Sequence, residues 1–318
     1  MTEITATPSL TRRLSAYFTT RSATGALRSG RQAYLFILPG LIVYAIFVLL
    51  PIISTVRYSF FDWTGFSEPT FIGFDNYIEA TRDADFWTAI SSNFFFVIFY
   101  TVLPILIGLF LTSLITRSKK LRGMAFFRTG LFIPQVMSPV VVGIIWRWLF
   151  TLDGPINQIF ATIGLDAWVR PWLGDFTFAR VAVGAVGTWI EYGLCMVLFI
   201  AGMQSIDEDL YDAAKVAGAG AWQEFRYVTL PGLRQQLLVA FVLTFIAALR
   251  VFDTVFVLTN GGPGKTTIVT SYLVYDETFR RNRAGYGAAI AVMLAIVIAV
   301  VSAAVFWLQN RSENEAQT

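Results

Sequence analysis

The chain has 318 residues, of which 56% are hydrophobic and 14% are charged, and its formal net charge is +3. Soluble domains carry about 25% charged residues, so this composition excludes a water-soluble globular protein and indicates a membrane protein. The absence of histidine and the single cysteine, Cys195, exclude histidine-based acid–base chemistry, most transition-metal sites and an internal disulfide.

Residues 1–32 form a tail that is rich in threonine, serine and arginine. A secretory signal peptide would end in a small-residue cleavage site. No such site precedes the first apolar stretch, and that stretch is long. The tail is therefore predicted to be a cytosolic N-terminal segment, and residues 311–318 are predicted to form a cytosolic C-terminal tail.

Six apolar stretches near the length of a membrane-crossing helix follow the tail. Several contain proline, which bundled membrane helices tolerate. They predict an all-α integral membrane protein with six transmembrane helices in residues 33–310 and with both termini in the cytoplasm. The predicted spans cover residues 33–56, 90–116, 124–150, 178–204, 233–259 and 284–308.

The distribution of lysine and arginine supports this orientation. With the N-terminus inside, the inner segments carry 14 of the 24 basic residues and the outer segments with their borders carry nine. An inner excess is the expected bias, and it is strongest in the N-terminal half, where residues 117–128 alone hold five. The outer cluster from Arg280 to Arg283 departs from this rule.

The outer loops 57–89 and 151–177 are rich in aromatic residues. Tryptophan and tyrosine concentrate at membrane–water interfaces, and this preference explains most of them. The alternative interpretation is a rim on which an external partner sits.

The polar stretch Ser205–Pro231 lies between the fourth and fifth predicted spans and is far longer than a connector needs. Ser205 and Glu208 have the spacing of a capping box at the start of a helix. A glycine-containing break at 217–220 interrupts that helix, and a second helix is predicted over Ala221–Leu230, with a proline to stop it. Small residues on this hook would let another backbone approach closely. Because the hook lies in water, its partner is expected to be a soluble protein.

This stretch resembles the EAA loop of permease subunits in binding-protein-dependent type I ABC importers. The family signature reads Glu-Ala-Ala, three residues, Gly, nine residues, an aliphatic residue, one residue, Leu-Pro, and every spacing is kept here. The family's glutamate is Asp212 in this chain, and the aspartate usual before the glycine is Ala217. The resemblance implies that the loop couples to a cytosolic ATPase, and the alternative is an amphipathic interfacial loop without a partner. The implied coupling residues are Asp212, Ala213, Ala214, Gly218, Phe225, Leu230 and Pro231.

The stretch 258–267 invites comparison with a phosphate-binding loop because it contains Gly264-Lys265-Thr266. That motif requires a glycine at the position of Thr259, and it joins a strand to a helix inside the cell. This stretch instead joins two predicted spans on the outer side, which excludes a phosphate-binding loop. Thr-Asn-Gly-Gly-Pro at this place resembles the carbohydrate-importing branch of the family, and the resemblance covers residues 33 to 308. Further marks of that branch are Trp146–Phe150 with Gly154 and Asn157, and Gly285–Ala289.

Charged residues inside predicted spans are costly to insert and indicate functional sites. Glu191 lies within the fourth span, while Arg250 and Asp253 in the fifth are spaced to share a helix face and to pair. Asn93 and Thr244 are milder cases. One interpretation is a buried ion pair that fixes helix packing, and the other is a polar patch in a translocation cavity.

Aromatic side chains beside these groups suit a sugar, which needs hydrogen bonds and aromatic surface together. In the maltose-importing relative the spans that flank the EAA loop bear the sugar, and the resemblance implies positions near Gly187, Ile190, Glu191 and Leu194, and Thr244, Ala247, Ala248 and Val251. Several of these are small or aliphatic here, so the resemblance implies a different sugar or a site in a partner subunit. The predicted substrate-pathway residues are Gly187, Trp189, Glu191, Tyr192, Thr244, Ala248, Arg250, Val251 and Asp253.

The resemblance implies a multi-pass cell-membrane permease without an ATP site of its own, which moves a sugar inward by alternating access. ATP and Mg²⁺ would be used by a separate dimeric ATPase, an external binding protein would deliver the sugar, and a second homologous permease would complete the pathway. No metal, no other cofactor and no nucleic-acid partner is expected. A stand-alone ion-coupled secondary transporter is the alternative, although no convincing internal repeat supports it. A membrane enzyme would need a nucleophile beside a base, which the chain does not provide.

Overall fold

The computed structural model describes residues 30–117 and 124–316, and within them the chain is helical apart from loops and one small hairpin. The hairpin pairs β1 (Phe61–Asp62) antiparallel with β2 (Thr70–Phe71). The chain divides into two units, residues 1–54 and 55–318. Most of the predicted N-terminal tail, most of the basic loop at 117–128 and the end of the C-terminal tail lie outside the described residues.

The described part of the first unit is helical from residue 30 onward. It consists of α2 (Gly30–Tyr44), the π-helical η2 (Ala45–Leu49) and the start of α3 (Leu50–Tyr58). Pro39 lies inside α2. The segment Phe36–Tyr58 is long and apolar enough to cross a membrane.

The second unit contains the remaining elements. Its first half comprises α4 (Asp75–Arg82), α5 (Ala84–Val97), η3 (Ile98–Val102), α6 (Leu103–Arg117), α7 (Met124–Val136), α8 (Pro139–Leu149), α9 (Pro155–Thr162) and η4 (Asp166–Trp168). Its second half comprises α10 (Phe178–Met203), α11 (Glu208–Val216), α12 (Ala221–Glu224), η5 (Phe225–Thr229), α13 (Leu230–Gly232), α14 (Arg234–Leu249), α15 (Asp253–Leu258), α16 (Thr270–Tyr275), η6 (Asp276–Arg280) and α17 (Ala284–Ala316).

Within the described residues, four helices are long and apolar enough to cross a membrane, and two bent helix pairs would raise the number to six. The third predicted span is one of these pairs, because α7 and α8 meet at 100°. Pro139 opens α8 and has no N–H to continue the helix before it, and Ser138 is extended, as residues before proline usually are.

The fifth predicted span, 233–259, does not form one helix. It bends by 69° from the helices before it, and α14 ends at Leu249. Residues 250–252 leave the helix, and the short α15 follows at Asp253. The sequence is apolar on both sides of this break, which we call the corner (residues 250–252), so hydropathy alone could not reveal it.

Helix α10 is the centre of the second unit and is buried on most sides. Glycines allow this burial, because a Cβ at Gly184 would lie 2.5 Å from the Phe99 ring and one at Gly187 would lie 2.0 Å from the Tyr100 ring. Both rings belong to the π-helical η3. Thr188 on α10 donates a hydrogen bond of 2.6 Å to the Phe99 carbonyl. Small residues on α10 therefore permit the close packing of α10 against η3.

The loop 151–177 is built around Asn157, whose side chain is 2% exposed. Its Nδ2 donates to the carbonyls of Thr151, Leu152 and Arg170, and its Oδ1 accepts from the Trp172 indole at 2.9 Å. The Gly-x-x-Asn pattern that resembles sugar permeases therefore has a structural role in this loop.

The Thr-Asn-Gly-Gly-Pro stretch forms the turn that follows α15. Asn260 and Gly261 have φ of 53° and 80°, values that asparagine and glycine tolerate best. The Thr267 hydroxyl closes the turn by donating to the Gly262 carbonyl at 2.7 Å. Arg180 of α10 donates to the Thr266 carbonyl and anchors the turn.

The arginines at 280–283 are all paired with carboxylates. Arg280 lies 3.2 Å from Asp276, and Arg281 lies 2.8 Å from Glu277. Arg283 reaches Glu79 of α4 at 2.6 Å, across 204 residues of sequence. Burial raises the pKa of the Glu277 carboxyl, while Arg281 and Arg283 act in the opposite direction. This cluster departs from the expected excess of basic residues on the inner side, and neighbouring carboxylates compensate its positive charges.

Replacing Glu79 by glutamine is expected to lower the free energy of unfolding by less than about 1 kcal/mol, because both partners are partly exposed. The difference should shrink at high salt. Thermal unfolding in detergent at two salt concentrations measures it. Glu68→Gln is the matched control, since Glu68 lies in the same loop and has no ion pair among the described residues. Equal effects of the two substitutions at low salt would contradict a specific role for the Glu79–Arg283 pair.

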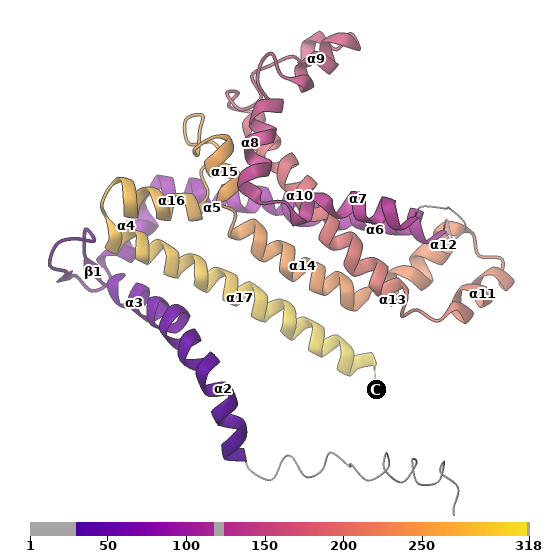
Figure 1. Ribbon diagram of the computed structural model, residues 1–318, viewed down its shortest axis with the longest axis horizontal. Coiled ribbons are helices and arrows are strands. Elements are labelled where there is room, and N and C mark those ends of the chain that lie inside the picture. Colours follow the sequence, from indigo (N-terminus) through magenta and orange to yellow (C-terminus); the bar gives the residue numbers. More distant parts are fainter. Residues whose placement is uncertain (1–29, 118–123, 317–318) are drawn as a thin grey trace, which may run out of the picture. The chain divides into compact units, whose positions relative to one another are not determined.

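Figure 1 shows how the loop elements of the second unit are distributed along its long helices. Helices α11, α12 and α13 lie at one end of α10, α14 and α17, and α4, β1 and α16 lie toward the other end. The predicted inner hook and the predicted outer loop 57–89 therefore lie at opposite ends of the helices.

Candidate functional site: coupling segment and membrane corner

The coupling segment (residues 205–232) begins with a cap that differs from the predicted one. Asp207 is the N-cap of α11, and its Oδ1 accepts from the Asp209 N–H at 3.1 Å. Ser205 instead donates to the Gly202 carbonyl at 2.7 Å, at the end of α10. The predicted capping box of Ser205 and Glu208 is therefore wrong, because Ser205 still belongs to the turn that ends the preceding helix.

The predicted break at Gly218 is confirmed. Gly218 has a φ of 79°, and its N–H donates to the Lys215 carbonyl at 2.9 Å. The Ala219 N–H donates to the Ala214 carbonyl at 2.9 Å. These two bonds form a Schellman motif, which requires a residue with positive φ at this place. Figure 1 shows the resulting turn between α11 and α12.

The second helix of the segment is longer than predicted. It runs through the π-helical η5 and ends at Gly232, one residue beyond Pro231. Pro231 lies in the last turn of this helix, so the helix passes the proline by one residue instead of ending before it. The Tyr211 and Thr229 hydroxyls are 3.0 Å apart and join α11 to η5.

Large apolar side chains on the coupling segment are exposed, most of all Val216 at 91%, Tyr227 at 73% and Trp222 at 72%. Exposed apolar surface outside a membrane span marks an interaction site. Asp212 and Lys215 form an exposed ion pair of 2.9 Å, and this contact raises the pKa of Lys215. A cation therefore lies beside the small residues Ala213 and Ala214 on the surface of α11.

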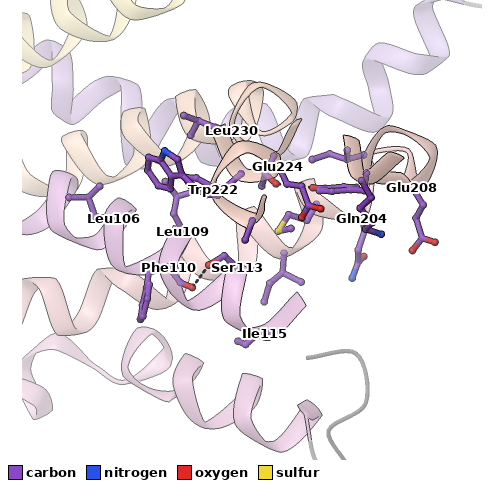
Figure 2. A pocket seen from close by; sticks show the side chains of 18 of the residues that line it. Leu106, Leu109, Phe110, Ser113, Ile115, Gln204, Glu208, Trp222, Glu224 and Leu230 are labelled. Atoms are coloured by element: carbon purple, nitrogen blue, oxygen red, sulfur yellow. Dashed lines mark hydrogen bonds between the residues drawn. The ribbon is translucent and has the colours of Figure 1, made fainter. Parts of the chain in front are cut away.

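A cleft of about 1770 Å³ separates the coupling segment from the ends of α6 and α10. Figure 2 shows Leu106, Leu109 and Phe110 of α6 facing Trp222 and Leu230 of the coupling segment. The cleft lies beside a packed contact, because Ile206 and Leu230 of the segment lie against the cluster that contains Leu109 of α6 and Phe199 of α10.

The corner is the second notable feature, because irregular backbone inside a membrane needs side-chain partners or a water-filled cavity. Asn93 of α5, which is 1% exposed, supplies such partners. Its Nδ2 donates to the carbonyls of Ala248 and Leu249 at 3.2 and 3.0 Å. Its Oδ1 accepts from the N–H and the hydroxyl of Thr270 at 2.9 and 2.8 Å.

Arg250 and Asp253 do not share a helix face, because α14 ends between them. Both side chains are exposed, and the described part of the chain contains no ion pair for either. The prediction of a self-satisfied pair at these two positions is therefore wrong. The charged groups of Arg250 and Asp253 therefore lie exposed at the helix break, where they can contact a ligand in a cavity or a partner subunit.

The other predicted pathway residues differ in exposure. Trp189 and Glu191 are half-buried, and Trp189 packs edge-on against Trp146 at 5.7 Å. The Thr244 hydroxyl donates a hydrogen bond of 2.7 Å to the Ala240 carbonyl of its own helix. Five of the predicted pathway residues are buried, namely Gly187, Tyr192, Thr244, Ala248 and Val251.

Tyr100 is a residue that sequence reasoning missed. It is 3% exposed, and its hydroxyl makes no well-formed hydrogen bond to the described residues. The hydroxyl lies beside Thr254 of α15, with Glu191 and Asp253 in its electrostatic neighbourhood. Tyr100 lies in an apolar stretch of the sequence, which gave no signal that its hydroxyl is buried beside α15.

Comparison with known proteins gives a consistent result. The family described as "Binding-protein-dependent transport system inner membrane component" matches residues 104–314. The probable ABC transporter permease protein YurN of Bacillus subtilis is 36% identical over 85% of this chain and 92% of its own length. The probable starch degradation products transport system permease protein AmyD of Thermoanaerobacterium thermosulfurigenes is 33% identical over 91% of this chain and 97% of its own length.

A solved structure shares the fold. The crystal structure of a bacterial ABC transporter that imports the acidic polysaccharide alginate contains a chain with a TM-score of 0.74 and 24% identity. The match covers 88% of this chain and 95% of that chain.

Proposed function

The chain belongs to the inner membrane components of binding-protein-dependent transport systems, in the carbohydrate-uptake branch of type I ABC importers, and from this we propose that it moves an oligosaccharide inward by ATP-driven alternating access. It is a multi-pass transport subunit whose ATPase is a separate chain. Relatives of the chain include the lactose transport system permease protein LacF and the diacetylchitobiose uptake system permease protein NgcF, which support a sugar of this class.

The observation that carries the proposal is the coupling segment. It presents exposed apolar side chains and a tight glycine turn at one end of the long helices (Figure 1). We propose that this segment docks on a dimeric ATPase, which binds ATP and Mg²⁺, and that both chain termini lie on the same cytoplasmic side. The bent pair of α7 and α8, together with α14, would then complete six spans. ATPase closure must favour one of two states for transport to occur.

The corner supports a pathway shared with a second permease. Broken helices in transporters line substrate sites because their free backbone groups and charges need a polar surrounding. Arg250 and Asp253 are exposed at such a break, with Glu191 half-buried nearby on α10. We place the sugar path along this surface, between this chain and a homologous partner.

Reconstitution into liposomes with the ATPase and the external binding protein tests the proposal. Sugar uptake should require ATP and the binding protein. Uptake by the chain alone, driven by an ion gradient, would overturn the proposal in favour of a secondary transporter.

In the same liposomes, Asp253→Asn is expected to lower the uptake rate about tenfold, which corresponds to about 1.4 kcal/mol at the rate-limiting barrier. The carboxylate is exposed at the corner and its loss leaves the core packing intact. Asp166→Asn, in the outer loop 151–177, is the control and should retain the wild-type rate. Wild-type uptake by the Asp253 variant would remove this carboxylate from the sugar path.

A further inference from the structure

Two helix ends meet at Asn93 inside the second unit. The last carbonyls of α14 have no partner within their own helix, and neither have the first N–H groups of α16. No water is available in a membrane interior to satisfy them. Asn93 bonds to the α14 end through Nδ2 and to the α16 start through Oδ1, so one side chain caps both helices.

The asparagine side chain is fully used. An amide has two N–H donors and one oxygen with two lone pairs, and the four bonds at Asn93 employ all of them. The groups around it are buried as well: Ala248 and Thr270 are 0% exposed and Leu249 is 1% exposed. Aspartate would lack the donors, and leucine would lack every polar atom. No other residue of this size satisfies both helix ends.

The neighbouring residue strengthens the same junction. Ser92 accepts a hydrogen bond of 2.9 Å from Arg180 of α10, and Arg180 also donates to the Thr266 carbonyl in the turn before α16. Consecutive residues of α5 therefore hold α10, the end of α14 and the start of α16 in one junction.

We propose that Asn93 is a positioning residue for transport, which fixes the corner to α5 and α16 while the coupling segment moves α14. The corner then keeps Arg250 and Val251 in place relative to α10 as the protein changes state. This inference rests on the proposed sugar path along the corner. Without the hydrogen bonds of Asn93, the movement that the ATPase imposes on the coupling segment would bend the corner instead of moving the residues that line the sugar path.

The test uses the full reconstituted complex and measures ATP molecules hydrolysed per sugar imported. This ratio does not depend on how much complex folds, so a purely structural role would leave it unchanged. Thr270→Val is expected to raise the ratio about fivefold, the effect of losing roughly one hydrogen bond at the junction, and Asn93→Asp, which removes both donors to the end of α14, is expected to raise it further. Thr270→Ser keeps the hydroxyl and should retain the wild-type ratio.

Thr112→Val is the matched control. Thr112 is 1% exposed and bridges α6 to the Met196 carbonyl of α10 at 3.2 Å, away from the corner. Its substitution should lower stability without changing the ratio. If Asn93→Asp fails to fold, Thr270→Val decides the question, because it removes one bond and leaves Asn93 in place. A wild-type ratio in Thr270→Val, or an equal rise in Thr112→Val, overturns the positioning role. A wild-type complex that imports no sugar overturns the proposed function instead.

Discussion

Gly218→Asp is expected to leave the protein folded in the membrane and to lower both sugar uptake and sugar-stimulated ATP hydrolysis at least about tenfold, the size of a 1.4 kcal/mol loss at a contact. A Cβ at Gly218 would meet no atom of this chain within 4 Å, so the space around it is open to a partner. Aspartate tolerates positive φ better than most residues, which keeps the folding cost small. The loss would come from a charged side chain at the docking surface.

The control for this experiment lies two residues away. Gly220 has a φ of −76° and is the N-cap of α12, a position that favours aspartate. Gly220→Asp adds the same charge to the same turn and should keep most of the activity. Co-purification of the ATPase with each variant locates the defect. Equal activity of the two variants would mean that Gly218 is a turn residue without a role in docking.

Gly187→Ala is expected to destabilise the folded protein by about 3 kcal/mol, because overpacking of a tight core has costs of this order. The new Cβ would lie 2.0 Å from the Tyr100 ring. Thermal unfolding in detergent, followed by size-exclusion chromatography, measures the effect. Tyr100→Ala in the same background removes the ring and should restore part of the lost stability.

Gly193→Ala on the same helix is the control, since its Cβ would lie 3.4 Å from Gln135 and meet an ordinary contact. This experiment separates two roles for Gly187. A glycine that lines the sugar path would alter sugar selectivity and leave stability unchanged. A stable Gly187→Ala protein with altered selectivity would therefore contradict the packing role.

The sequence predicted much of the coupling segment, because its signals are local. The turn at Gly218 depends on backbone conformation, and the spacing of glycine and proline is visible in the sequence. The N-cap was misplaced by two residues, from Ser205 to Asp207, because both residue types cap helices equally well.

The corner could not be predicted in the same way. Its position depends on Asn93, which is separated from Leu249 by 156 residues, and the charges of Arg250 and Asp253 mark this place in the sequence without showing that the helix breaks there. Tyr100 was missed for a similar reason, since its place beside Thr254 depends on packing between segments far apart in the sequence. Tertiary hydrogen bonds decide both features, and one sequence does not display them.

The proposed topology puts residues 280–283 on the outer side, and the paired arginines there carry a consequence for biogenesis. Asp276 and Glu277 are within the same short segment as Arg280 and Arg281, so these charges can cross the membrane already neutralised during insertion. Arg283 has its closest partner in Glu79, which is synthesised and exported much earlier. In that topology the Glu79–Arg283 pair joins the first outer loop to the start of the last helix, and it forms only after both have been exported.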